Sequence, residues 1–281
     1  MMFFGKNKEK EFKMIWEIER NGKRSFLAGT AHFFPYSFKE SLTRYIAGTR
    51  TVMFEGPLDR ENMNKVVQAG TDQAGTEHIL DALEKTVVEE MTNLLFPACK
   101  SRNPFFLMNP RTLKTENLVY ELTKNMKPWL TFFTIWSTYL ERCGWKYSVD
   151  MEAYTIAREM GKEILFLESI EEQIGVLEGI NQDRILAFLG RVHDWHRIAR
   201  DYAECYLNGD LNSMKSTGLR FPSRHYAVID RRDHLFFERM QPFLEQGDAL
   251  VFVGAPHMRG IGRLLTAAGY QTRGPSAPGG P

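Results

Sequence analysis

The sequence predicts an α/β fold in which helices flank a mixed, largely parallel central sheet. Short apolar runs that alternate with helical stretches at both ends of the chain are typical of this class. The 281 residues are 43% hydrophobic and 25% charged, as in ordinary soluble globular proteins. Residues 59–145 have helical periodicity, which predicts a large helical insertion. We expect one domain over residues 1–274 and a Pro- and Gly-rich tail, 275–281, that is disordered.

The first half of the sheet is predicted from a hairpin and a strand–helix–strand unit. The predicted elements are strands at 12–18 and 25–28, a helix at 38–47 and a strand at 51–54. Asn21-Gly22 between the first two strands favours a tight hairpin turn. A strand, a helix and a strand in about thirty residues are typical of a parallel sheet.

The same rhythm returns after the insertion. The predicted elements are a helix at 150–160, a strand at 163–167, helices over 171–245, a strand at 249–253, a helix to 268 and a closing strand near Tyr270. Within the insertion, an aromatic cluster at 129–136 suits an apolar ligand or a membrane surface, but buried helix packing is the simpler interpretation.

Net charge and the lengths of apolar runs argue against nucleic-acid binding and against a membrane span. The chain has 36 basic and 35 acidic residues, a net charge of +1, which does not match a nucleic-acid-binding protein. No apolar run reaches the 18 or so residues of a membrane span, and the apolar residues 1–4 are too few for a signal peptide. We therefore expect no nucleic acid, no membrane span and a cytoplasmic location, and a homo-oligomer stays open.

The motif Gly-x-x-His occurs four times, at Gly29–His32, Gly75–His78, Gly190–His193 and Gly254–His257. Only the first and the last follow a predicted strand. Ligands of open α/β sheets bind just beyond the carboxyl ends of the strands, so His32 and His257 are the candidate site residues. We expect ordinary structural or surface roles for the other two.

Two carboxylates are candidates for the same rim, since Glu55 and Glu168 each end a predicted parallel strand. Helix capping or ion pairing is the alternative for each. A second candidate is the pair His193 and His196, with Asp201 beyond. Its His-x-x-His spacing suits a metal, but ordinary surface histidines are the simpler interpretation.

Six stretches, in this order, carry a resemblance: Gly-Thr-x-His, a Glu closing the next strand, an Asp near a helix start, Leu-Glu-Ser-x-Glu-x-Gln, an Arg-Asp helix and Gly-Ala-x-His. They lie at Gly29–His32, Glu55, Asp150, Leu167–Gln173, Arg232-Asp233 and Gly254–His257. Together they resemble the TraB/PrgY/GumN family over nearly the whole chain.

The resemblance implies a fold similar to that of the TIKI metalloproteases, the erythromycin esterases and the haem-binding ChaN proteins. It also implies metal-dependent peptide cleavage or the shutting down of peptide signals. Carried over to this sequence, the site residues are His32, Glu55, Arg232 and His257, with Arg231 as an alternative register for the arginine.

Our first hypothesis is a hydrolase of a peptide or a small ester. Neutral His32 and His257 and the Glu55 carboxylate would hold a divalent ion, whose water attacks a carbonyl while Arg232 steadies the oxyanion. Such a nitrogen and oxygen ligand set suits manganese, cobalt, iron or zinc.

Three alternatives remain. In a metal-independent hydrolase of the esterase type, His32 or Glu55 is the general base. In a binding protein, the histidines ligate haem or hold a peptide without cutting it. In a purely structural role, they hydrogen-bond backbone groups at the strand ends.

Overall fold

The computed structural model describes residues 9–71, 78–97, 118–218, 221–223 and 229–277. Its sheet has the strands β1 (Ile15–Arg20), β2 (Lys23–Thr30), β3 (Thr51–Phe54), β4 (Glu163–Phe166), β5 (Ala249–Gly254) and β6 (Gln271–Arg273). Their order is β4-β3-β5-β2-β1-β6. The pairs β4–β3, β3–β5 and β5–β2 are parallel, whereas β1 is antiparallel to β2 and β6. The predicted α/β class and mixed sheet are confirmed.

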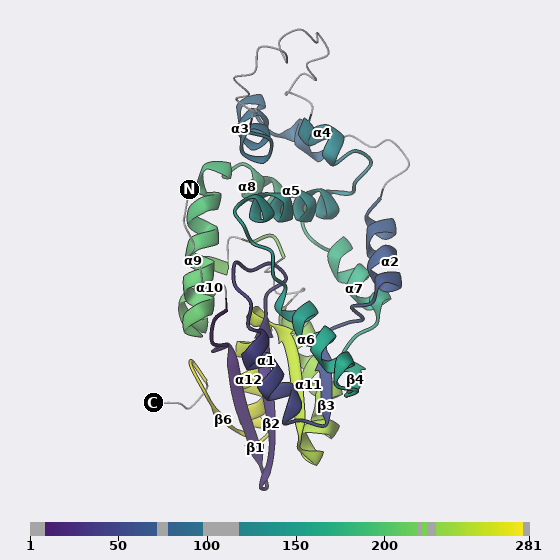
Figure 1. Ribbon diagram of the computed structural model, residues 1–281. Helices are drawn as coiled ribbons and strands as arrows, with labels where there is room; N and C mark the ends of the chain where they lie inside the picture. The colour runs from purple at the N-terminus through teal and green to yellow at the C-terminus, as the bar shows by residue number, and fades with distance from the viewer. Residues whose placement is uncertain (1–8, 72–77, 98–117, 219–220, 224–228, 278–281) are drawn as a thin grey trace.

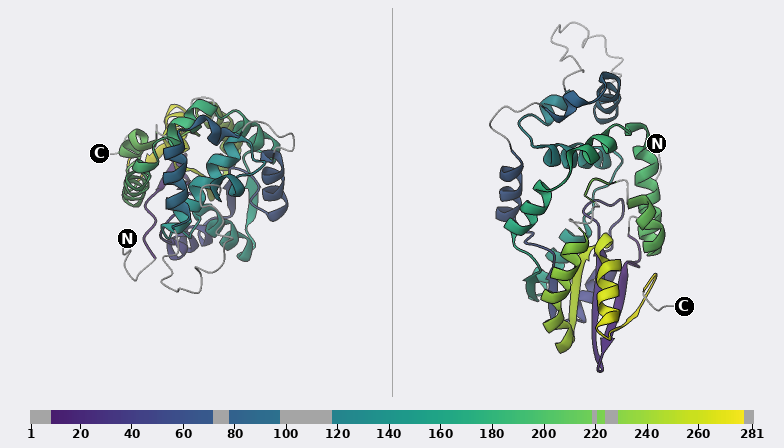
Figure 2. Two further views of the ribbon diagram at one scale, coloured as in Figure 1. Left: turned by 90° about the horizontal axis from the view of Figure 1, so that it is seen from above. Right: turned by 180° about the vertical axis from the view of Figure 1, so that it is seen from behind.

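Helices cover both faces of this sheet (Figures 1 and 2). The pair α1 (Lys39–Ala47) and α6 (Val149–Glu159) packs together on one face, and the pair α11 (Asp230–Gln246) and α12 (Ala255–Ala267) on the other. Because both faces are covered, every residue of β3 is buried, and β5 is buried up to its last residue. The rings of Phe54 and Phe252 stack across these two strands at 5.3 Å.

The remaining helices stand beyond the carboxyl ends of the parallel strands, in the upper half of Figure 1. They are α2 (Arg60–Gly70), η1 (Ile79–Ala82), α3 (Lys85–Leu95), α4 (Leu118–Leu122), α5 (Pro128–Arg142), α7 (Ile170–Glu178), α8 (Gln182–Leu189), η4 (Val192–Asp194), α9 (Trp195–Asn208) and α10 (Leu211–Gly218). Those from α2 to α5 belong to the predicted insertion, of which 72–77 and 98–117 lie outside the described residues. The buried apolar residues of sheet and insertion form one continuous cluster.

The hairpin between β1 and β2 has the expected turn. Asn21 and Gly22 both have positive φ, 54° and 73°, which suits the tight turn that joins twisted antiparallel strands. It sets the register that places Gly29 and Thr30 at the end of β2, beside Val253 and Gly254.

The first residues of the expected disordered tail are packed, in contrast to the prediction. The indole nitrogen of Trp16 on β1 donates a 2.7 Å hydrogen bond to the carbonyl of Pro275, and Ala277 N donates to Gly274 O. Trp16 is 1% exposed, so this bond satisfies a buried donor. Residues 278–281 lie outside the described residues.

Across the described ranges, none of the helices combines the length and the apolar character that crossing a membrane requires.

Candidate active site

The two predicted Gly-x-x-His motifs lie side by side. The parallel pairing of β2 and β5 sets Gly29 beside Val253 and Thr30 beside Gly254. Both strands therefore end at the same end of the sheet. Gly29 allows a close approach there, because a Cβ on it would lie 2.5 Å from the Met258 sulfur and 3.0 Å from the Ala255 backbone. The first turn of α12, which carries His257, can therefore pack directly on β2.

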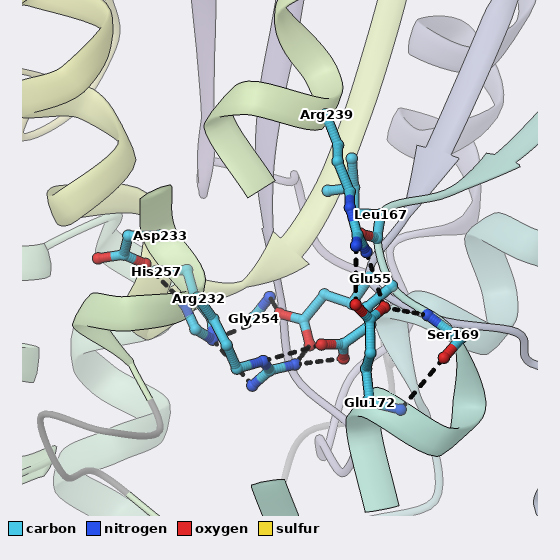
Figure 3. A network of polar contacts seen from close by, with 10 residues as sticks. Glu55, Leu167, Ser169, Glu172, Arg232, Asp233, Arg239, Gly254 and His257 are labelled. Carbon is cyan, nitrogen blue, oxygen red and sulfur yellow. Dashed lines mark hydrogen bonds and ion pairs between the residues drawn. The ribbon is translucent and has the colours of Figure 1, made fainter. Parts of the chain in front are cut away.

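His257 is 3% exposed and is held on both sides (Figure 3). Its Nδ1 lies 2.7 Å from Asp233 Oδ1, and its Nε2 lies 3.4 Å from Arg232 Nη1. A guanidinium can only donate, so Nε2 accepts in this arrangement and Nδ1 carries the hydrogen that Asp233 receives. His257 is thus oriented by a carboxylate at Nδ1, and its Nε2 faces the guanidinium.

Arg232 is the centre of a buried ion cluster. Its Nε and Nη2 donate to both oxygens of Glu168, at 3.0 and 2.5 Å, and Nη2 also donates to Glu55 at 3.1 Å. The guanidinium stacks over Phe236 at 4.9 Å, and that ring in turn meets the edge of His257. Burial raises the pKa of the Glu168 carboxyl more than Arg232 lowers it. The cluster fixes Nη1 so that it faces His257.

Glu55 lies between the strand ends, and both of its oxygens are engaged. Oε1 accepts from Gly254 N at 2.5 Å and lies 3.7 Å from His257 Nε2, and Oε2 accepts from Arg232. Burial alone would raise the pKa of Glu55, but Arg232, His257 and the Gly254 N–H together outweigh it and the pKa is lowered. Glu55 is therefore an anion at neutral pH and a weak base.

His32 has a carboxylate partner of its own. Its Nδ1 pairs with Asp150 Oδ2 from the first turn of α6, while Asp150 Oδ1 accepts from Ser148 Oγ at 2.5 Å. Asp150 is 5% exposed, whereas the imidazole of His32 is 68% exposed. The Asp150 charge outweighs desolvation and raises the pKa of His32 to about 9. Without a metal ion beside it, the imidazole of His32 is therefore favoured as a cation at neutral pH.

All four residues line one cavity of about 260 Å³ between the strand ends and the upper helices. His32, Glu55, Arg232 and His257 are at its polar end. Mostly apolar side chains from α5, α7 and α9 line the rest, together with the polar Gln173 and Ser223. The predicted meeting of the two motifs is therefore observed. The ring nitrogens of His32 and His257 contact carboxylate and guanidinium groups rather than backbone groups.

As arranged, His32, Glu55 and His257 do not fit a divalent ion. Both oxygens of Glu55 are engaged, the Nε2 of His257 faces a guanidinium cation, and the Nδ1 of His32 is paired with Asp150. Within the described ranges, no group of three or more His, Cys, Asp or Glu side chains is placed to hold a metal.

The structure distinguishes the remaining candidates. Arg231 is exposed while Arg232 is buried, so Arg232 is the arginine that faces the site. His193 and His196 are exposed, outside the cavity lining. His78 caps η1, where its Nδ1 accepts from Leu80 N, a structural role as expected.

Sequence reasoning gave Asp233 no role, although it is the partner of His257. The resemblance covered it only as the neighbour of Arg232. The sequence feature that indicates a role for Asp233 is its position directly after Arg232. Successive helix residues point about 100° apart, so that two neighbours can contact different groups of one site.

A comparison with protein-family models matches residues 14–273 to the model described as the TraB/PrgY/gumN family. A search of curated proteins finds no match.

Proposed function

The chain belongs to the TraB/PrgY/gumN family, and from this premise we propose that it is a hydrolase of a peptide or ester bond. The observation that carries the proposal is the convergence of two histidine–aspartate pairs and a buried arginine on one cavity. In this pattern a carboxylate orients an imidazole, leaves its Nε2 for proton transfer and stabilises its charged form.

The two histidines take different parts in the reaction. When a water molecule takes the place of Arg232 Nη1 beside His257 Nε2, Nε2 accepts a proton from it, and the resulting hydroxide adds to the substrate carbonyl. His32, protonated at neutral pH, donates its proton to the leaving group as the carbonyl–oxygen or carbonyl–nitrogen bond breaks. Water thus supplies OH to the acyl carbon, and the leaving group departs with H. His257 afterwards loses its added proton to solvent, and His32 takes one up, so that both return to their starting states.

Arg232 supports this reaction electrostatically. Its Nε and Nη2 are held by Glu168 and Glu55, which orients Nη1 toward the reacting centre before substrate arrives. A cation fixed in this way stabilises the negative charge that develops on the carbonyl oxygen, without reorganisation during the step.

The predicted manganese, cobalt, iron or zinc ion belongs to a metal-dependent form of the proposal. In that form His32, Glu55 and His257 would hold the ion, and Arg232 would have to withdraw from His257 Nε2 and His32 to lose its proton, because both imidazoles would be needed as ligands. A bound divalent ion would supply acidified water and charge neutralisation.

The test is hydrolysis of 4-nitrophenyl esters and of a peptide library by the purified full chain, with His257→Gln and His32→Gln as variants. We expect His257→Gln to lower kcat/KM by about 10²–10⁴-fold on both kinds of substrate. His32→Gln should do so on peptides, whose amine leaving group needs a proton, and should have a smaller effect on 4-nitrophenyl esters, whose leaving group departs as a stable anion. The exposed His196→Gln is the matched control and leaves kcat/KM unchanged. Wild-type rates in both variants would contradict the proposal.

Elemental analysis and exhaustive chelation separate its two forms. Full activity after chelation supports the metal-independent form. If the protein holds a stoichiometric metal and loses activity when the metal is removed, the metal-dependent form is supported. A Soret band with added haem, lost in His257→Ala and accompanied by no hydrolysis, would instead support the predicted binding protein.

A further inference from the structure

The cavity has two chemically different ends. The site residues described above form its polar end, where the strands stop. Opposite them lie aromatic and aliphatic side chains, among them Phe133 and Trp136 of α5 and Val176 and Leu177 of α7. The apolar end has no part in the proton transfers proposed above.

These side chains form a wall that tertiary packing holds in place. The Trp136 ring contacts Tyr139, Phe188, Trp195 and Phe221 at centroid distances of 5.1–5.7 Å. Trp136 is 8% exposed, and Phe132 beside it is fully buried. Because the wall is fixed by its own neighbours, the space in front of it is preformed rather than closed by collapse of the side chains.

The size of this space limits what it accepts. An apolar cavity of about 150 Å³ accommodates benzene. At about 30 Å³ for a water-sized group, the 260 Å³ of the whole cavity, its polar end included, hold at most roughly eight or nine such groups. That corresponds to a medium-length alkyl chain or a two-ring aromatic group.

His32 separates the cavity from a second, open groove. The groove is lined by His32, Phe33 and Trp145, which also line the cavity, and by polar side chains that include Glu141 and Lys146. His32 therefore stands where a substrate would pass from the inner cavity to a more open groove that is lined by aromatic and polar side chains.

We propose that the inner cavity binds an apolar acyl group of up to about eight carbons, and that the leaving group lies in the outer groove beside His32. This assignment rests on the proposed hydrolase function and deepens it. The substrates are amphipathic esters or amides with a medium-chain or aromatic acyl part. Each methylene that enters the cavity strengthens transition-state binding about fourfold, the fold-change equivalent to about 0.8 kcal/mol.

The experiment measures kcat/KM for 4-nitrophenyl esters with two to fourteen acyl carbons. In parallel, calorimetry measures binding of 2-alkanones of the same lengths, which present a carbonyl but cannot be hydrolysed. We expect both series to rise about fourfold per methylene to an optimum near eight carbons and then to fall.

Two variants at one position test the assignment in opposite directions. Leu177 is half-buried on α7, so that Leu177→Ala enlarges the cavity and should move the optimum to longer chains, and Leu177→Trp fills it and should move the optimum to shorter ones. Ile174→Ala is the matched control, because Ile174 is on the same helix outside the cavity lining. A variant that merely destabilised the fold would lower all rates without moving the optimum.

The outcomes separate this inference from the proposed function. Length-dependent 2-alkanone binding with no ester hydrolysis supports the acyl cavity and contradicts the hydrolase. Hydrolysis that is indifferent to chain length, with an optimum unmoved in both Leu177 variants, supports the hydrolase and overturns the acyl cavity.

Discussion

His32 and His257 occupy equivalent positions after neighbouring strands, yet their surroundings make them chemically different. His32 is open to solvent, and its close partner, Asp150, is a single buried carboxylate, so the charged imidazole is favoured. His257 is buried between Asp233 and the Arg232 cation, which requires an accepting Nε2. One motif used twice thus places its histidine in two different electrostatic surroundings.

We predict that His32 titrates near pH 9 in the folded chain, above its ordinary value of 6.5. Asp150→Asn keeps the shape of the partner but removes its charge, and it should bring the titration back toward 6.5. Nitrogen-15 NMR of the imidazole measures both. Equal values in wild type and Asp150→Asn would contradict the electrostatic role of Asp150.

The raised pKa of His32 makes the stability of the fold depend on pH. A pKa raised by folding means that the ion pair stabilises the fold fully below about pH 6.5, and that this contribution is lost as the pH rises through about 9. The free energy of unfolding, measured with urea, should decline between about pH 6.5 and 9 in the wild type and should not do so in His32→Gln. If His32 is the general acid, kcat/KM should fall over the upper part of the same interval.

Helix α11 organises the site at the scale of the elements. Arg232 holds Glu168 and Glu55, and its neighbour Asp233 holds His257 on α12. Two turns later, Arg239 donates to the Leu167 carbonyl at 2.6 Å and to both oxygens of Glu172 (Figure 3). One helix therefore fixes the end of β4 from both sides, and the orientation of Arg232 depends on it.

The close approach of α11 and α12 leads to a prediction at Gly260. A Cβ on Gly260 would lie 1.6 Å from Asp233 Oδ2, so Gly260→Ala must displace the carboxylate from His257. We expect the downfield Nδ1 proton resonance of His257 to disappear and kcat/KM to fall about 10²-fold or more.

The matched control for Gly260 is Gly175 on α7. A Cβ there meets nothing within 4 Å, so Gly175→Ala should leave both signals unchanged and slightly stabilise the helix. If the Nδ1 proton resonance of His257 persisted in Gly260→Ala, the hydrogen bond between Asp233 and His257 would not depend on the close packing at Gly260.

For the whole molecule, Arg232 joins the ends of β3 and β4 to α11 and α12. Its side chain is 11% exposed, and the side chain of Glu168 is 1% exposed. Arg232→Met would leave both glutamates buried without their counter-ion. We expect it to lower the free energy of unfolding by about 3–5 kcal/mol, as loss of one partner of a buried ion pair does.

Chemical denaturation followed by circular dichroism measures this loss. The exposed neighbour Arg231 provides the control, since Arg231→Met should change stability by no more than about 0.5 kcal/mol. Similar small effects of both substitutions would mean that the cluster contributes little to the fold.

Much of the architecture could be predicted because it depends on local pattern. The β3 strand has the predicted bounds, Asn21-Gly22 makes the predicted turn, and the two strand-end histidines meet as expected. Alternation, turn residues and parallel strand ends are each visible within short windows of sequence. The aromatic residues of 129–136 are packed as expected, and three of them also line the cavity.

By itself, the sequence determined the α/β class, the family and which strand ends carry histidine, because these depend on residue type and spacing. Tertiary structure alone decided the partners of those histidines. Asp150 is 118 positions from His32 and Asp233 is 24 from His257, and a carboxylate so far along the chain can be assigned only when packing sets it 3 Å or less from a ring nitrogen. Protonation follows from such neighbours and from burial, so the acid and base roles proposed here depend on the fold rather than on the motif.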